Sequence, residues 1–408
     1  MDKQEFIQIR KFIVKLGKML HKYGTPAFRW EAHMSEVAAY LNVHAGFIST
    51  PTSLTFVIWS DKHEDEYNHA ARVQPGDIDL GSLSRTDELV NKLLAGEYTL
   101  AEANERLDEI DELPNFYNSF LTCIAFGLST GAFAIVMGAS LVDAYASGFI
   151  GLIMYLFAAW AMRSKRVNHM LEVAVALVAG LCACAISSFI DPAINIRLVV
   201  LSSIIIFIPG LALTIGLAEL SSRHLVSGTA RVMDALMQLF KLYFGAFLGI
   251  ALGFTLFSEV AMTTTEALPK WAIFVAVLIL CSALVIIFKI RIKHAPWAIT
   301  CGFIGYFGTY WASKYLEFGL GTFVGAFAVG VFANLFTRIA NAPASIVLMQ
   351  GLIVLVPGSK TYIGLNSFVS GQDFVSTDHI GQETFVIFMS LVAGLIFANV
   401  IMPTKKAL

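Results

Sequence analysis

The sequence carries little charge. Only 14% of its 408 residues are charged, whereas 57% are hydrophobic. A typical soluble domain carries about 25% charged residues, so this composition excludes an ordinary soluble protein and favours one surrounded by lipid. The sequence also lacks the catalytic motifs GxSxG, HExxH and GxxxxGK[ST]. We therefore expect a protein that is not an enzyme and that has no cofactor and no nucleic-acid partner.

Paired metal-binding or disulfide cysteines are also missing. None of the five cysteines belongs to a CxxC motif, and Cys182 and Cys184 are two residues apart, so they face different sides of a helix. We interpret the cysteines as small buried hydrophobic residues. The segment His63–Glu66 with His69 could bind a metal, but we interpret it as a solvated loop. The sequence thus predicts no metal site.

Residues 1–115 differ in character from the rest. Before Pro114 there are 12 lysine and arginine residues against 19 aspartate and glutamate residues. Apolar residues recur at helical spacing from Phe6 to Leu20, which predicts a helix packed into a core rather than lying on a membrane surface. A small cytoplasmic α+β head is expected, with Thr99 and Glu102 as a capping box. Its further predicted elements are a helix over Phe28–Leu41, one or two strands over Ala45–Ser60 broken near Pro51, and two short helices over Thr86–Leu113.

Ten apolar stretches follow, each about the 17 to 25 residues needed to cross a bilayer. They are approximately 119–138, 142–162, 168–190, 196–220, 233–257, 271–288, 295–313, 318–337, 344–366 and 384–402. The sequence therefore predicts a polytopic α-helical membrane protein with ten crossings.

The charges between these stretches predict an orientation. With the head in the cytoplasm, the inner connections hold 11 of the 16 basic residues beyond the head, as expected if positive charge stays inside. The outer connections are mainly acidic, with Glu259, Glu266, Asp373, Asp378 and Glu383. Both termini are thus expected in the cytoplasm, with the protein in the cytoplasmic (inner) membrane. The inner basic residues are Arg163, Lys165, Arg166, Arg223, Arg231, Lys289, Arg291, Lys293, Arg338, Lys405 and Lys406.

The fourth and ninth stretches share a motif. PGLALTIGL from Pro209 and PGSKTYIGL from Pro357 are identical at five of nine positions, with an offset of 148 residues. Five is an odd number of crossings, so a second set of five helices would lie inverted relative to the first, as in many secondary transporters. We therefore predict two inverted five-helix repeats, over residues 116–260 and 261–408.

Each Pro-Gly pair is expected to break its helix, because proline removes a backbone donor and glycine relaxes the chain. Freed backbone groups are costly in hydrocarbon unless they line a polar cavity. The half-helices that begin at Gly210 and Gly358 would point their positive N-termini at each other, which favours a carboxylate ligand. The alternative is a pair of kinks that serve helix packing. The predicted substrate site comprises Pro209, Gly210, Thr214, Pro357, Gly358, Lys360 and Tyr362.

Three ionisable residues in these stretches have two interpretations each. Lys360 could pair with a substrate carboxylate or extend to the headgroups. Glu219 could carry a proton, or form an interfacial ion pair with Arg223 four residues on. Asp143 could be a proton or substrate site, or the N-cap of the second span.

Two further charges lie within predicted spans. Lys241 is deep enough in the fifth span to need a partner. Glu172, in the first turn of the third span, is expected to be satisfied by the helix dipole.

Together these residues resemble the threonine/serine exporter (ThrE) family. The resemblance rests on the head, Asp143 after Gly138, Glu219 ten residues beyond Pro209, and Arg231 after it. The second Pro-Gly helix with Tyr362, and Glu31 seven residues after Gly24, fit the same pattern. Some bacteria divide this architecture into a YjjP-like and a YjjB-like subunit, which residues 1–260 and 270–408 respectively resemble.

The resemblance implies an exporter of threonine and serine driven by the proton motive force, or of succinate, as associated with the divided form. Glu219 or Asp143 would couple transport to protons, and we expect structural or gating roles for Arg223, Arg231 and Glu31. A channel lined by the two breaks is the alternative mechanism. The abundant small residues of the spans permit a homo-oligomer.

Overall fold

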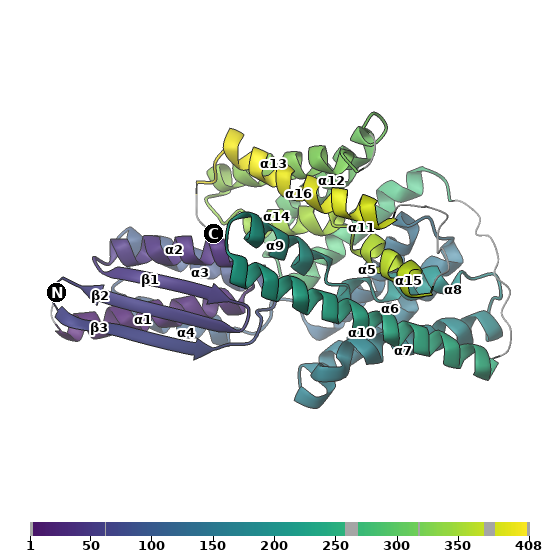
Figure 1. The fold of residues 1–408 in the computed structure, drawn as a ribbon, viewed down its shortest axis with the longest axis horizontal. Coiled ribbons are helices and arrows are strands. Elements are labelled where there is room, and N and C mark those ends of the chain that lie inside the picture. Colours follow the sequence, from purple (N-terminus) through teal and green to yellow (C-terminus); the bar gives the residue numbers. More distant parts are fainter. Residues whose placement is uncertain (1–2, 62, 258–267, 317–318, 371–379, 406–408) are drawn as a thin grey trace.

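The computed structural model describes residues 3–61, 63–257, 268–316, 319–370 and 380–405. Residues 3–61 and 63–112 form a mixed head of helices and strands at one end, and long helices make up most of the rest of the described chain (Figure 1). The predicted boundary at 260/261 lies outside the described residues, as do Lys406 and the predicted outer residues Glu259, Glu266, Asp373 and Asp378.

The head is built around an antiparallel sheet of order β1-β2-β3. Thr50 pairs with Ser53, so Pro51 and Thr52 make the turn at which the predicted strand breaks. Alternate residues of β2 are buried, and Leu54, Phe56 and Ile58 share one hydrophobic cluster with the first helix. The amphipathic first helix is thus part of the head's core, as predicted. The elements are α1 (Lys3–Lys22), α2 (Ala27–Tyr40), β1 (His44–Thr50), β2 (Ser53–Ser60), β3 (His63–Arg72), α3 (Leu80–Leu94) and α4 (Leu100–Glu112).

The interpretation of His63–His69 as a loop is wrong, because this segment belongs to β3. The strand is polar because it lies at the edge of the sheet, next to β2. Alternate side chains from Glu66 to Arg72 are exposed. Backbone pairing with β2 stabilises this strand, so its hydrophobicity alone does not predict it.

Side-chain caps fix the starts of the last two head helices. Thr99 accepts a hydrogen bond from the Glu102 amide, and the Glu102 carboxylate accepts one from the Thr99 amide, so the predicted capping box is present. The Asp79 carboxylate likewise accepts from the Ser82 amide at 2.8 Å. This cap starts α3 at Leu80, six residues earlier than predicted.

Helices occupy all ten apolar stretches. By length and hydrophobicity, seven helices within the described residues could cross a membrane, or eight if the bent pair of 196–203 and 205–221 is one span; Trp271–Ile287 is a shorter apolar helix. The chain is therefore a polytopic helical membrane protein, and ten crossings and an inverted repeat stay predictions. The elements are α5 (Ser119–Val136), α6 (Leu141–Ala161), α7 (Lys165–Phe189), α8 (Ile196–Ser203), η1 (Ile205–Phe207), α9 (Gly210–Ser221), α10 (Leu225–Phe257), α11 (Trp271–Ile287), η2 (Ile292–His294), α12 (Ala295–Ala312), α13 (Gly321–Ala340), α14 (Ser345–Leu355), α15 (Gly358–Ser370) and α16 (Ile380–Ile401).

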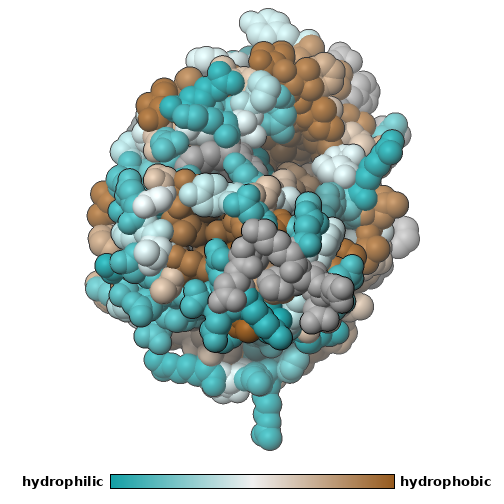
Figure 2. Space-filling view, turned by 90° about the vertical axis from the view of Figure 1, so that its left-hand side faces the viewer, coloured by the Kyte–Doolittle hydropathy of each residue, from teal (hydrophilic) through white to brown (hydrophobic). Residues whose placement is uncertain are grey.

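The surface reflects this division. Seen from the head end, hydrophilic side chains dominate the lower part of the view, and hydrophobic patches appear across its middle and at its top (Figure 2). Between the helices, small residues allow close backbone approach: a Cβ on Gly180 would lie 2.8 Å from the Ile250 nitrogen. All five cysteines are free and either buried or half-buried, as predicted.

Candidate functional site

The two Pro-Gly segments interrupt their helices and meet each other. The helices before and after the first break are bent by 50°. A Cβ on Gly210 would lie 2.6 Å from Val356 Cγ1 and 3.1 Å from the Gly358 Cα, so only hydrogen fits there. The starts of α9 and α15 therefore lie against one another, which brings Pro209, Gly210, Pro357 and Gly358 together as the motif predicts.

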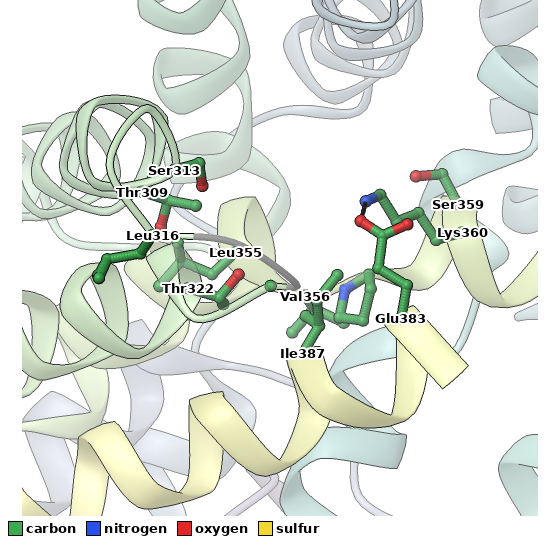
Figure 3. A pocket seen from close by; sticks show the side chains of 12 residues that line it. Thr309, Ser313, Leu316, Thr322, Leu355, Val356, Ser359, Lys360, Glu383 and Ile387 are labelled. Carbon is green, nitrogen blue, oxygen red and sulfur yellow. Dashed lines mark hydrogen bonds and ion pairs between the residues drawn. The ribbon is translucent and has the colours of Figure 1, made fainter. Parts of the chain in front are cut away.

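A cavity of about 730 Å³ lies beside the second break (Figure 3). Its volume lies within the usual range for small-molecule sites. Hydroxyl side chains from α12 and α13 line one side, and the start of α15 with α16 lines the other. The lining residues are Thr309, Ser313, Leu316, Gly319, Thr322, Leu355, Val356, Pro357, Ser359, Lys360, Glu383 and Ile387. A smaller cavity of about 160 Å³ borders both Gly210 and Gly358 and is mainly apolar.

Three of the predicted substrate residues, Pro209, Thr214 and Tyr362, do not line either cavity. Thr214 is buried, and its hydroxyl donates to the Gly210 carbonyl 3.1 Å away. Tyr362 is also buried, with its ring centroid 6.5 Å from that of Tyr243. Both side chains therefore stabilise the half-helices rather than face the cavities.

Lys360, in the first turn of α15, forms an ion pair at the edge of the large cavity with Glu383, in the first turn of α16. The two side chains are 43% and 35% exposed. Lys360 therefore has an anionic partner within the protein, which neither of its two interpretations included. Sequence reasoning assigned Glu383 only to an outer connection, since a partner 23 residues away carries no spacing signal.

Glu219 is fully buried at the end of α9 nearest the head. Its Oε1 accepts from the Ala27 amide at 2.9 Å and from Arg231 Nη2 at 3.2 Å. Its Oε2 accepts from the Ser227 hydroxyl at 2.8 Å. One carboxylate thus joins the head helix α2 to α9 and α10.

The predicted pair of Glu219 with Arg223 is wrong. Arg223 ends the turn after α9 in a left-handed conformation, with φ of 65°, and its side chain is exposed. The next helix begins at Leu225, eight residues before the predicted span, so Arg231 is helical and returns toward the buried carboxylate.

Asp143 is buried but is not the N-cap of its helix. Ser140 is the cap, and Asp143 completes a capping box by accepting from the Ser140 amide and hydroxyl. Its other oxygen accepts from the Asn195 amide at 2.8 Å, just before α8. These donors are all neutral, and they join α6 to α8.

Lys241 has the partner that its depth requires. Its Nζ lies 3.6 Å from Glu172 Oε2, which links α10 to α7. The expectation that the helix dipole satisfies Glu172 therefore omitted its main partner.

Glu31 contacts the turn after α9. Its Oε1 accepts from the Ser49 amide at 2.9 Å, and its Oε2 lies 3.5 Å from Nδ1 of His224. Phe28 packs near the same imidazole, with ring centroids 6.5 Å apart. The start of α2 is therefore attached to the first set of helices.

The head also contacts the connection between α11 and α12. Asp79 pairs with Lys289 at 3.2 Å, and Glu88 pairs with Arg291 at 2.7 Å and with Lys293. Although burial raises the pKa of the Glu88 carboxyl, these two cations outweigh it and hold the pKa below its usual range. Sequence reasoning gave the basic residues an orienting role only and missed these partners.

His294 lies at the centre of this contact. Its Nε2 is 3.3 Å from the Ser84 hydroxyl, and its ring packs edge-on to Phe336. Burial lowers the pKa of the imidazole to about 4, helped by Lys293 and Arg291 and opposed by Glu88. The ring is therefore neutral at physiological pH. Across the described ranges, no group of three histidine, cysteine, aspartate or glutamate side chains could hold a metal ion.

This architecture defines a polytopic membrane protein with two helix breaks in contact, the second of which borders a cavity lined by charged and hydroxyl-bearing side chains. The family model described as "Putative threonine/serine exporter" matches residues 11–253, and that described as "Threonine/Serine exporter, ThrE" matches residues 273–401. The chain therefore belongs to the threonine/serine exporter (ThrE) family, in its fused form.

Fungal membrane proteins are among the curated relatives. The chain is 25% identical to pheromone-regulated membrane protein 10 of Eremothecium gossypii, over 91% of this chain and 51% of that protein. It is 24% identical to the Saccharomyces cerevisiae protein of the same name, over 93% and 50%, and 27% identical to that of Candida albicans, over 89% and 34%. The chain thus spans about half or less of these relatives. No solved structure matches it.

Proposed function

We propose that the protein is a secondary exporter of small hydrophilic carboxylates, with threonine and serine as its substrates, driven by the proton motive force. The observation that carries this proposal is the meeting of the two broken helices, the second of which borders a cavity lined by Lys360, Glu383 and hydroxyl side chains. Helix N-termini directed into a membrane protein favour the carboxylate group of a substrate. Membership of the exporter family agrees with this direction of transport.

The close packing of Gly210 on Val356 and Gly358 favours a carrier over a channel. A channel needs a continuous path, whereas a carrier closes one side while the other opens. In the proposed cycle, substrate enters beside the breaks, and Lys360 binds its carboxylate.

We propose Glu219 as the carboxylate that couples transport to protons. It lies on α9, the half-helix that begins at the first break, and protonation would free Arg231 and the Ala27 amide. Asp143 is the competing candidate, but its neutral donors favour a structural role. If Glu219→Gln and Asp143→Asn both leave proton-coupled transport intact, this assignment is wrong.

We also propose the cytoplasmic (inner) membrane as the location, with the head and both termini in the cytoplasm. The basic connection Lys289–Lys293 forms ion pairs with acidic residues of the head. This agrees with the rule that positively charged connections stay on the cytoplasmic side of the membrane. Protease should therefore remove the head from inverted vesicles but not from right-side-out vesicles. Cleavage in right-side-out vesicles alone would reverse the orientation.

Counterflow into proteoliposomes tests the transport proposal. Vesicles preloaded with unlabelled threonine should accumulate labelled threonine in a saturable manner, and external serine should inhibit this. Inhibition by succinate instead of serine would move the substrate to dicarboxylates, the alternative within the family resemblance. Flux without counterflow would favour a channel.

A further inference from the structure

The large cavity has two opposite charges on its wall rather than one. Lys360 from α15 and Glu383 from α16 point toward each other at its edge, while Thr309 and Ser313 lie across from them (Figure 3). A site built for a dicarboxylate would repel its ligand with Glu383. The pair is instead complementary to a molecule that carries one carboxylate and one ammonium group.

The electrostatic surroundings fix the direction in which such a ligand would lie. Lys360 lies in the first turn of α15, where the unpaired backbone N–H groups of a helix start add positive charge. Glu383 lies in the first turn of α16, on the other side of the cavity edge. Because both residues lie at helix starts, the direction comes from the side-chain charges: a carboxylate is favoured at the cation Lys360 and an ammonium at the anion Glu383.

The ion pair can yield to a ligand. Both side chains are more than a third exposed, and ion pairs of this kind are weak in water. A ligand that offers each partner a new opposite charge replaces the pair without leaving a charge unmatched. In addition, Thr309, Ser313 and Thr322 contribute hydroxyl-bearing side chains to the cavity wall for the remainder of the ligand.

We propose that Glu383 is the specificity-determining residue of this cavity and binds the ammonium group of a zwitterionic amino acid whose carboxylate binds Lys360. This inference rests on the proposed transport function and deepens it. It predicts that Glu383 separates amino acids from dicarboxylates, a distinction that Lys360 alone does not make.

The test is threonine counterflow with the Glu383→Gln variant, with serine and succinate as competitors. Serine should inhibit at least tenfold less effectively than in the native protein, because its ammonium loses a charged partner, while inhibition by succinate should be unchanged or stronger. Glu172→Gln is the matched control, since Glu172 also pairs with a lysine within the helices but lies outside the cavity. It should behave as the native protein does.

The exchanged variant Lys360→Glu with Glu383→Lys separates recognition from structure. If the pair served only to join α15 to α16, the exchange would restore inhibition by serine. Equal losses of inhibition by serine and by succinate in Glu383→Gln would also indicate a purely structural role. Either result overturns the inference.

Thermal stabilisation of the purified native and Glu383→Gln proteins by serine and succinate reports binding without transport. Native protein stabilised by serine, with the effect lost in Glu383→Gln, supports the site even if counterflow fails and the transport proposal falls. Native protein that serine neither stabilises nor exchanges overturns the inference.

Discussion

Arg231 is the one cation that contacts the buried Glu219 carboxylate among the described residues. Replacing it with methionine keeps most of the side-chain volume but removes the charge. The carboxylate, which has 0% exposure, would then retain only the Ala27 amide and the Ser227 hydroxyl as donors. An ionised group would be left in the protein without a counter-charge.

The size of the effect follows from burial. Removing one partner of a buried ion pair typically costs about 3–5 kcal/mol. The Arg231 side chain is itself 19% exposed, so water can reach part of the site after its removal. We therefore expect about 3 kcal/mol for Arg231→Met. Arg223→Met removes an exposed arginine from the adjoining turn and should change stability by at most about 0.5 kcal/mol.

The fraction of detergent-purified protein that survives heating, followed by fluorescence-detected gel filtration, measures these differences. Arg231→Met should melt well below the native protein, and Arg223→Met should match it. Adding Glu219→Gln to Arg231→Met should recover much of the loss, because a neutral amide needs no counter-charge. Equal melting of the two arginine variants would refute the reasoning. A double variant as unstable as Arg231→Met would show that packing, rather than charge, causes the loss.

Three further predictions concern the head contact and the breaks. Below pH 6.5, His294 is protonated in the unfolded state but stays neutral in the folded state until about pH 4. The free energy of unfolding should therefore fall by up to about 3 kcal/mol as the pH is lowered from 6.5 to 4. His294→Gln should flatten this pH dependence in thermal melts. Gly210→Ala should lower the free energy of unfolding by about 1–3 kcal/mol and reduce counterflow, because the packing leaves no space for its Cβ. Gly46→Ala is the control, because a Cβ at Gly46 would meet open space. A fully active Gly210→Ala variant would contradict the packing. Glu88→Lys should speed proteolytic release of the head, and adding Lys293→Glu should slow it again in part, because the ion pair is restored with its charges exchanged. An exposed pair of this kind contributes about 0.2–1 kcal/mol. If the effects of the two substitutions simply add, the contact is not present.

Local patterns were sufficient for much of the fold. The helical spacing from Phe6 to Leu20, the capping box at Thr99 and the helix interruptions at the two Pro-Gly pairs each depend on residues close in sequence, and all are present. The β3 strand was missed because it is stabilised by pairing with β2. The composition of a polar edge strand does not indicate such pairing.

The site was predicted less completely. The motif brought the two breaks together, but Thr214 and Tyr362 turned to internal contacts. Charge pairs were the least predictable, because helical spacing suggested Arg223 for Glu219, whereas a turn and an early helix start supplied Arg231. The partners of Lys360 and Lys293 lie 23 and 205 residues away, a separation at which one sequence carries no pairing signal.

The head is fastened at two places to one end of the helices. Ala27 and Glu31 hold the turn region of α9 and α10, and Asp79 and Glu88 hold the connection of α11 and α12. If the helices at these two attachments moved relative to each other, their displacement would be smallest beside the head and would grow with distance from it. Separation at the head end must first break one attachment, so the far end opens with less work.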